Sequence, residues 1–178
     1  MKRKFFILAF LTLIIFITPI KSNAYSTDPK QFIAEIVLDV KKILNTNADK
    51  ETKSKKLSDI ARITVDIKGV AYYTLGSYRK DLSEDELKRY STIYEKYFLK
   101  SLTSRLSDYS DQKIEVLSSK ILNEKYTMVK SKLLGNDKKP EIKIEWRVYT
   151  KNPEAPLIRD LIVEGLSLAR TQKEEFSS

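Results

Sequence analysis

Cysteine and histidine are both absent from this sequence, and glycine occurs only four times. Without cysteine, no disulfide can staple the fold and no thiol is available for a lipid anchor. The lack of both residues excludes Ser-His-Asp hydrolysis, Cys-His catalysis and zinc sites made from His or Cys ligands. The glycines are scattered, so no glycine-rich loop can cradle a phosphate. An enzyme built from this chain would have only Asp, Glu, Lys and Tyr for its chemistry.

The chain has more basic than acidic residues, and the two kinds are mixed along the sequence. Its 178 residues include 33 basic and 24 acidic side chains, which gives a formal net charge of +9. The two signs are interspersed and form neither the arm nor the stripe that nucleic-acid binding requires, so we expect no nucleic-acid partner. A mild positive excess is compatible with docking on an acidic partner or an anionic membrane surface.

The N-terminal segment has the pattern of a secretory signal peptide. Residues 2–4 are basic, residues 5–17 form an apolar run, and the small residues at 22–24 make a cleavage site. The alternative is an uncleaved membrane anchor, but the apolar run is too short to span a bilayer comfortably. We predict that residues 1–24 are cleaved and that residues 25–178 form a single domain, exported to a bacterial periplasm.

Apolar residues at helical spacing predict four helices before the first strand. We place them at residues 28–45, 48–63 and 66–76, and from Ser83 to the neighbourhood of Tyr109. Asp28 is a good N-cap, and Pro29 suits the first helical position because its missing N–H has no partner there. Ser83 and Glu86 form a capping box at the start of the long helix.

The C-terminal half changes to a period of two. Ile144, Trp146 and Val148 alternate with charged or polar residues within the strand predicted at 141–149. Further strands are predicted at 113–121, 125–134 and 157–163, with a turn at 135–137 and a final helix after Gly165. Because helices and strands are segregated along the chain, we predict an α+β fold in which helices pack on one face of an antiparallel sheet of about four strands.

Two acidic residues are candidates for general-base chemistry. Asp160 and Glu164 have apolar neighbours, and an enzymatic or small-ligand-binding domain would use one of them at the floor of a closed pocket. A structural pairing of Asp160 with Arg147 or Arg159 across the sheet is the favoured interpretation. The paired acids at 84–85 and at 108 and 111 are read as helix caps and solvated loop residues.

The many tyrosines allow two interpretations. In one, they belong to a packed core whose hydroxyl groups reach the rim. In the other, aromatic and aliphatic groups line a cleft between the long helix and the sheet. Helical spacing favours the core, because apolar stripes of this kind are usually buried, and a solid adaptor domain without a cavity remains a further alternative.

Several short motifs, taken in order, are similar to those of the MlaC family, also called the toluene-tolerance family. They are Asp66, Val70-Ala71, Leu75-Gly76, Tyr78-Arg79, the capping box, Ser104-Arg105-Leu106 with Tyr109, Ile144 to Arg147, and Asp160 with Val163 to Leu168 and Phe176. The resemblance runs from Asp28 to the C-terminus. The chain departs from the family pattern at Tyr78, where tryptophan is common, and at Gln172, where tyrosine is frequent.

The resemblance implies a curved sheet and a helical layer that enclose an apolar cavity for phospholipid acyl tails. It implies a monomeric periplasmic carrier without cofactor, metal or catalytic residue. Such a carrier moves phospholipid between an outer-membrane lipoprotein-porin complex and an inner-membrane ABC transporter with a ring of MCE domains. Its expected role is to maintain the lipid asymmetry of the outer membrane. On this basis the residues expected to contact the tails are Val70, Tyr73, Leu75, Tyr90, Tyr94, Tyr97, Met128, Ile144, Trp146, Val148, Leu161 and Val163. Arg79 and Lys80 are expected at the mouth, near the headgroup.

Overall fold

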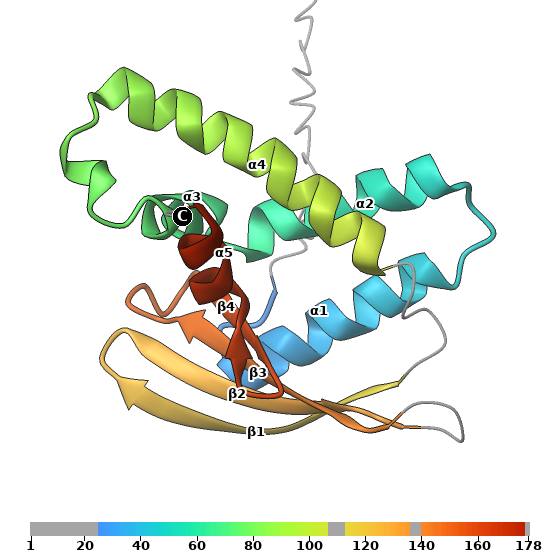
Figure 1. Cartoon of the computed structure of the whole chain (residues 1–178). Helices are drawn as coiled ribbons and strands as arrows, with labels where there is room; N and C mark the ends of the chain where they lie inside the picture. Colours follow the sequence, from blue (N-terminus) through green and yellow to red (C-terminus); the bar gives the residue numbers. More distant parts are fainter. Residues whose placement is uncertain (1–24, 107–112, 136–139, 177–178) are drawn as a thin grey trace, which may run out of the picture.

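The computed structural model describes residues 25–106, 113–135 and 140–176. Helices come first, then an antiparallel sheet, then one last helix (Figure 1). The elements are α1 (Pro29–Leu44), α2 (Lys50–Thr64), α3 (Ile67–Thr74), η1 (Tyr78–Lys80, a 3-10 helix), α4 (Glu84–Leu106), β1 (Ile114–Asn123), β2 (Tyr126–Leu133), β3 (Ile142–Tyr149), β4 (Leu157–Val163), β5 (Leu166–Ser167) and α5 (Leu168–Phe176). The predicted α+β class is confirmed.

Aspartate and serine caps set the helix starts. The carboxylates of Asp28, Asp49 and Asp66 accept backbone N–H bonds of 2.8 to 2.9 Å inside the first turns of α1, α2 and α3. Ser83 and Glu86 form the predicted capping box of α4, since the backbone N–H of Ser83 donates to Glu86 at 2.8 Å. These caps occupy N–H groups that have no partner within the helix, so each helix begins where the sequence indicates.

The strands form one sheet in the order β1-β2-β3-β4-β5, and every neighbouring pair is antiparallel. The inner face of the sheet carries Val129 opposite Trp146, together with Val148, and packs against α1. The outer face carries Met128 opposite Arg147. Because side chains alternate between the faces, each strand supplies both an apolar and a polar surface.

The hydrophobic core is divided into two clusters. The helical cluster joins α2, α3, α4 and α5 through Ala61, Ile67, Val70, Ala71, Tyr94, Leu99 and Ala169. The sheet cluster joins α1 to the inner face of the sheet through Phe32, Ile33, Ile36, Val129, Val148 and Ile158. α1 therefore packs with the sheet, whereas α2, α3, α4 and α5 pack mainly with one another.

Val65 and Asp66 connect the two clusters. Val65 packs on both of them and pairs with Ile158 in a parallel bridge. The next residue, Asp66, donates its backbone N–H to the carbonyl of Ile158 at 2.9 Å, and its carboxylate accepts from Arg159 at 2.6 Å. The start of α3 is therefore fixed to β4 by backbone and side-chain contacts.

Two parts of the fold differ from the sequence predictions or lie beyond them. The sheet has a fifth strand, β5, whose two residues pair with the end of β4; so short a segment shows no alternation. The signal peptide at 1–24, the turn predicted at 135–137 beyond its first residue, and the acids and Tyr109 proposed at 108–111 fall outside the described residues. Within the described ranges, no helix is both long and apolar enough to traverse a bilayer.

Asp66 should contribute more to stability than an ordinary cap. Replacing it with alanine removes both the N-cap of α3 and the ion pair with Arg159. We expect the free energy of unfolding, measured by urea denaturation, to fall by about 2 to 4 kcal/mol. Asp28→Ala, which removes the exposed cap of α1 alone, should cost about 1 kcal/mol. Equal losses in the two variants would contradict a special role for the pair.

Candidate functional site

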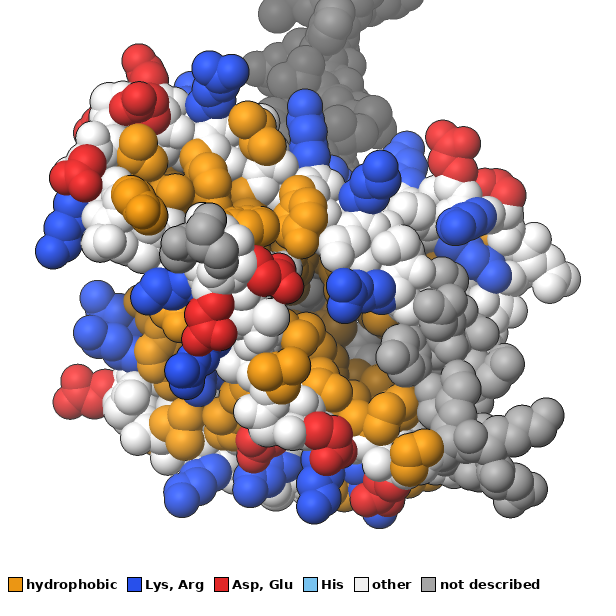
Figure 2. All heavy atoms as spheres, in the orientation of Figure 1, with side chains coloured by type: hydrophobic (Ala, Val, Ile, Leu, Met, Phe, Trp, Pro, Cys, Tyr) orange, Lys and Arg blue, Asp and Glu red, His pale blue; other side chains and the backbone are white. Residues whose placement is uncertain are grey.

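A recess opens between α4 and the sheet. Figure 2 shows hydrophobic side chains above and below this recess, with α4 on the upper side and the sheet on the lower side. α4 packs on α2 and α3, whereas α1 packs on β1 and β2, so the two walls belong to different clusters.

The inner face of the sheet carries apolar residues of β3 and β4. Ile144 lies opposite Val163, and Trp146 lies opposite Leu161, all on the inner face. Leu161 and Val163 are half-buried and belong to neither cluster. The indole N–H of Trp146 donates to Ser131 Oγ at 2.8 Å, which satisfies its polar atom and leaves an apolar ring surface. This wall can contact a hydrocarbon group without leaving a polar atom unpaired.

The helical side carries a row of aromatic rings. Tyr94 is buried and stacks between Tyr90 and Phe98, with ring centroids 6.1 and 6.2 Å away. Tyr97 and Phe176 meet at a centroid distance of 5.7 Å and remain 43% and 44% exposed. The row therefore runs from the helical cluster to an exposed aromatic pair, and it supplies amphipathic surface at the edge of the helical layer.

A hydrogen bond between α4 and α5 fixes this aromatic row. The hydroxyl of Tyr94 donates to Gln172 Oε1 at 2.5 Å. Burial raises the pKa of Tyr94, and the neighbouring Tyr90 and Tyr97 raise it further. Tyr94 is therefore neutral at physiological pH and acts as a donor. Sequence reasoning noted Gln172 only as a departure from a pattern, because nothing local indicates a partner 78 positions away.

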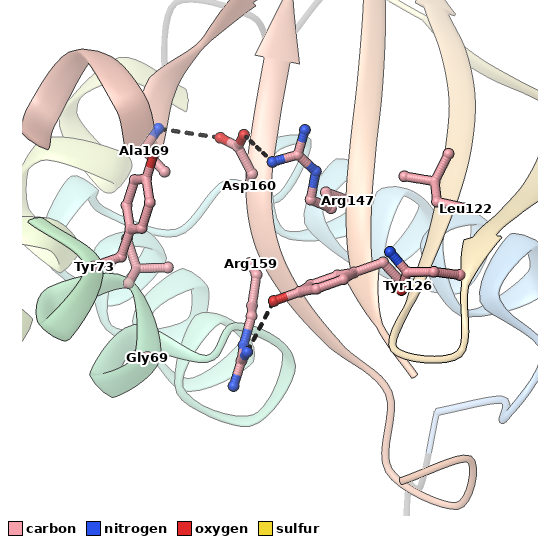
Figure 3. Close-up of a pocket in the computed structure, with 10 residues that line it drawn as sticks. Gly69, Tyr73, Leu122, Tyr126, Arg147, Arg159, Asp160 and Ala169 are labelled. Carbon is pink, nitrogen blue, oxygen red and sulfur yellow. Dashed lines mark hydrogen bonds and ion pairs between the residues drawn. The ribbon is translucent and has the colours of Figure 1, made fainter. Parts of the chain in front are cut away.

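A second cavity, of about 440 Å³, lies on the outer face of the sheet (Figure 3). It is bounded by α3 and α5 on one side and by the end of the β1-β2 hairpin on the other. Its lining residues are Gly69, Val70, Tyr73, Leu122, Asn123, Tyr126, Arg147, Arg159, Asp160 and Ala169. A one-residue bulge in β4 places Arg159 and Asp160 next to each other at this cavity.

The two candidate bases are engaged in structural contacts. Asp160 is buried and accepts from Ser167 Oγ at 2.6 Å and from the backbone N–H of Ala169 at 3.1 Å. Nη1 of Arg147 lies 3.6 Å from Oδ2 of Asp160, so the predicted pairing of Asp160 with Arg147 is confirmed. Glu164 is exposed and accepts the backbone N–H of Lys143. Both carboxylates therefore accept hydrogen bonds from groups of the fold itself.

The described residues also offer no metal centre. Among them, no group of three or more Asp or Glu side chains converges on one point, and the chain has no His or Cys. The arrangement is suited to binding an apolar group in the recess and a polar group in the outer-face cavity.

Comparison with known proteins identifies the family. The profile described as MlaC protein matches residues 31–178. The chain belongs to the MlaC family. Its fold is also similar to that of the phospholipid-binding protein from Ralstonia solanacearum, solved in complex with a phospholipid, with a TM-score of 0.69 and 18% sequence identity over 86% of this chain and 85% of that one. No protein of curated function matches the chain.

The structure distributes the tail-contact residues predicted from the MlaC resemblance over several surfaces. Ile144, Trp146, Val148, Leu161 and Val163 come together on the inner face of the sheet. Val70, Tyr90 and Tyr94 belong to or pack on the helical cluster. Tyr97 is exposed on α4, Leu75 is half-buried at the end of α3, and Tyr73 lines the outer-face cavity. Contact of these residues with lipid stays a prediction.

Three predicted residues lie apart from the inner face. Met128 is opposite Arg147, so its side chain belongs to the outer face rather than between Trp146 and Leu161. Arg79 and Lys80 are exposed on η1, and the Arg79 guanidinium lies 4.8 Å from the Tyr72 ring centroid. Their role near a headgroup also stays a prediction.

Tyr94 should make stability depend on alkaline pH. Its raised pKa keeps it neutral in the folded state, whereas in the unfolded chain it ionises near pH 10. Its contribution is therefore complete below about pH 10 and is lost as the pH rises further. Tyr94→Phe should lower the free energy of unfolding by about 1 kcal/mol at neutral pH, because the bond to Gln172 is lost.

The same variant should lose less stability between pH 9 and 11 than the wild-type protein. Urea denaturation at a series of pH values measures both effects. Tyr25, whose pKa is raised to about 12 by burial and by Asp39, keeps its own alkaline dependence in the variant. An unchanged pH slope in Tyr94→Phe would show that Tyr94 is not kept neutral by the fold.

Proposed function

We propose that this protein is a periplasmic phospholipid carrier that holds the acyl tails in the recess while the headgroup stays in water. One observation supports the location most directly: half-buried apolar residues of the inner face, Leu161 and Val163, belong to neither cluster of the core. Membership of the MlaC family supports the class of function. The structural neighbour is itself described as phospholipid-binding.

The physical need for such a carrier follows from the cost of exposing hydrocarbon to water. Two tails of about fifteen methylenes each, at roughly 0.8 kcal/mol per methylene, make a barrier on the order of 20 kcal/mol. An apolar recess lowers this barrier by replacing water around the tails, and it needs no catalytic group. This agrees with a chain that has neither histidine nor cysteine and whose candidate bases, Asp160 and Glu164, are already hydrogen-bonded.

The proposal extends to a route between membranes. After cleavage of its leader, the carrier would act as a monomer in the periplasm. It would exchange phospholipid with an outer-membrane lipoprotein-porin complex and with an inner-membrane ABC transporter that has an MCE-domain ring. This exchange would maintain the lipid asymmetry of the outer membrane. The family resemblance supports these partners. Without the leader, four of the 33 basic residues and none of the 24 acidic ones are lost, which leaves a net charge of +5 for docking on acidic surfaces. Arg79 and Lys80 would steer the headgroup at the mouth.

Leu161 provides the sharpest test of the recess. Leu161→Glu places a charge on the inner face at a half-buried position outside both clusters, so the domain should still fold while acyl tails are excluded. Native mass spectrometry of protein purified from cells should detect co-purified phospholipid on the wild-type protein. We expect the occupied fraction to fall several-fold in the variant.

The matched control is Ile63→Glu on α2. Ile63 is 61% exposed and belongs to neither cluster, so the same change of chemistry occurs on a helix that is not a wall of the recess. Circular dichroism checks that both variants keep the fold. Full occupancy of Leu161→Glu, or an equal loss in Ile63→Glu, would contradict tail binding at the inner face. Val148 is less suitable, because it is fully buried in the sheet cluster and a charge there would unfold the domain.

A further inference from the structure

We infer that the outer-face cavity is a second binding site, for an oxyanion of phosphate or carboxylate type carried by a small, partly apolar molecule. Figure 3 shows Asp160 beside Ala169 and Arg147, and Arg159 beside Tyr126, with Tyr73 on the α3 side of the cavity. The cavity lies on the face of the sheet opposite Trp146 and Leu161. The site is therefore distinct from the recess proposed for lipid tails and does not depend on that proposal.

The two arginines of the cavity have different roles. Arg159 is held in place: Nε and Nη2 each contact Asp66 at 2.6 Å, Nη1 donates to Tyr126 at 3.0 Å, and the guanidinium lies 3.6 Å from the Tyr149 ring centroid. Arg147 has one charged partner among the described residues, Asp160, at 3.6 Å. That distance exceeds hydrogen-bond length, and the Arg147 side chain is 42% exposed. Arg147 therefore keeps N–H donors for a ligand.

The other polar groups at the cavity also have donors to spare but few free acceptors. Asn123 accepts the backbone N–H of Lys125 with its side-chain oxygen at 2.9 Å, so its amide NH₂ is left. The Tyr126 oxygen accepts from Arg159, so its O–H proton can go to a ligand. Asp160 uses its two oxygens on Ser167 and Ala169. A site whose unused groups are mainly donors fits an oxyanion.

The local charge also favours an anion, although the formal charges of the side chains cancel. The two arginines are balanced by Asp66 and Asp160, but each aspartate also accepts from a backbone N–H in the first turn of a helix, Asp66 at α3 and Asp160 at α5. The positive ends of these helix dipoles offset part of the negative charge of both carboxylates. Because both carboxylates are engaged in this way, Arg147 is the cation of the cavity that has donors left for an anion.

The remaining walls define the size and character of the ligand. Val70, Leu122 and Ala169 are apolar, and Tyr73 adds an exposed aromatic ring. The volume of about 440 Å³ lies within the range of small-molecule sites. A compact aromatic or short aliphatic body bearing one phosphate or carboxylate would contact these walls while its oxygens meet Arg147, Asn123 and Tyr126.

Titration with phenyl phosphate and benzoate, followed by amide NMR shifts of the isotope-labelled full domain, tests the inference. We expect saturable shifts at Gly69, Arg147 and Ala169. Arg147→Gln should weaken the binding about tenfold or more, because a charge-assisted contact is lost. Arg147→Lys keeps the charge and should weaken it less. Arg89→Gln, which removes an exposed cation of α4 outside the cavity, should leave it unchanged.

Further measurements distinguish the two possible sources of the bound oxyanion, a free small anion and a lipid headgroup. Inorganic phosphate alone should bind more weakly than phenyl phosphate, and Arg147→Gln should leave phospholipid occupancy in native mass spectrometry unchanged. Absence of saturable shifts with either probe, or equal binding by Arg147→Gln, would overturn the inference. It would also be overturned if only a short-chain phosphatidylglycerol bound and its shifts extended to Trp146 and Leu161, since the cavity would then serve the lipid in the recess.

Discussion

The pairing of β3 with β4 is the constraint on which the rest of the structure depends. Because side chains alternate along a strand, one register decides which residues face the helices and which face outward. Trp146 opposite Leu161 gives an apolar inner face, and Arg147 opposite Asp160 gives a charged outer face. A shift of one residue would exchange these surfaces, so both candidate sites follow from a single register.

The divided core explains how a small domain can leave apolar surface available. The helical cluster holds α3, α4 and α5 together, while α1 completes the sheet cluster. The two are joined at Val65 and Asp66, where backbone pairing and the ion pair to Arg159 fix α3 against β4. This connection fixes the start of α3 beside β4, so the two clusters meet at one end of the sheet.

Local signals in the sequence predicted the elements well. Aspartate and serine caps marked the helix starts, and the alternation around Trp146 identified β3, because such patterns depend on neighbouring residues. The faces of other strands were harder to predict: Met128 was grouped with Trp146 as a tail-contact residue but lies opposite Arg147, because its face depends on register. The contacts of Arg159 with Asp66 and of Tyr94 with Gln172 join distant segments and leave no local pattern. The outer-face cavity was missed for the same reason.

The central claim is that acyl tails lie against the inner face of the sheet. Isotope-filtered nuclear Overhauser measurements between labelled protein and unlabelled bound phospholipid test it most directly. The account predicts contacts from acyl methylenes to the methyl groups of Leu161 and Val163 and to the Trp146 ring. Acyl contacts confined to Val70 and Leu122 in the outer-face cavity, or bound lipid without any contact to the inner face, would contradict it.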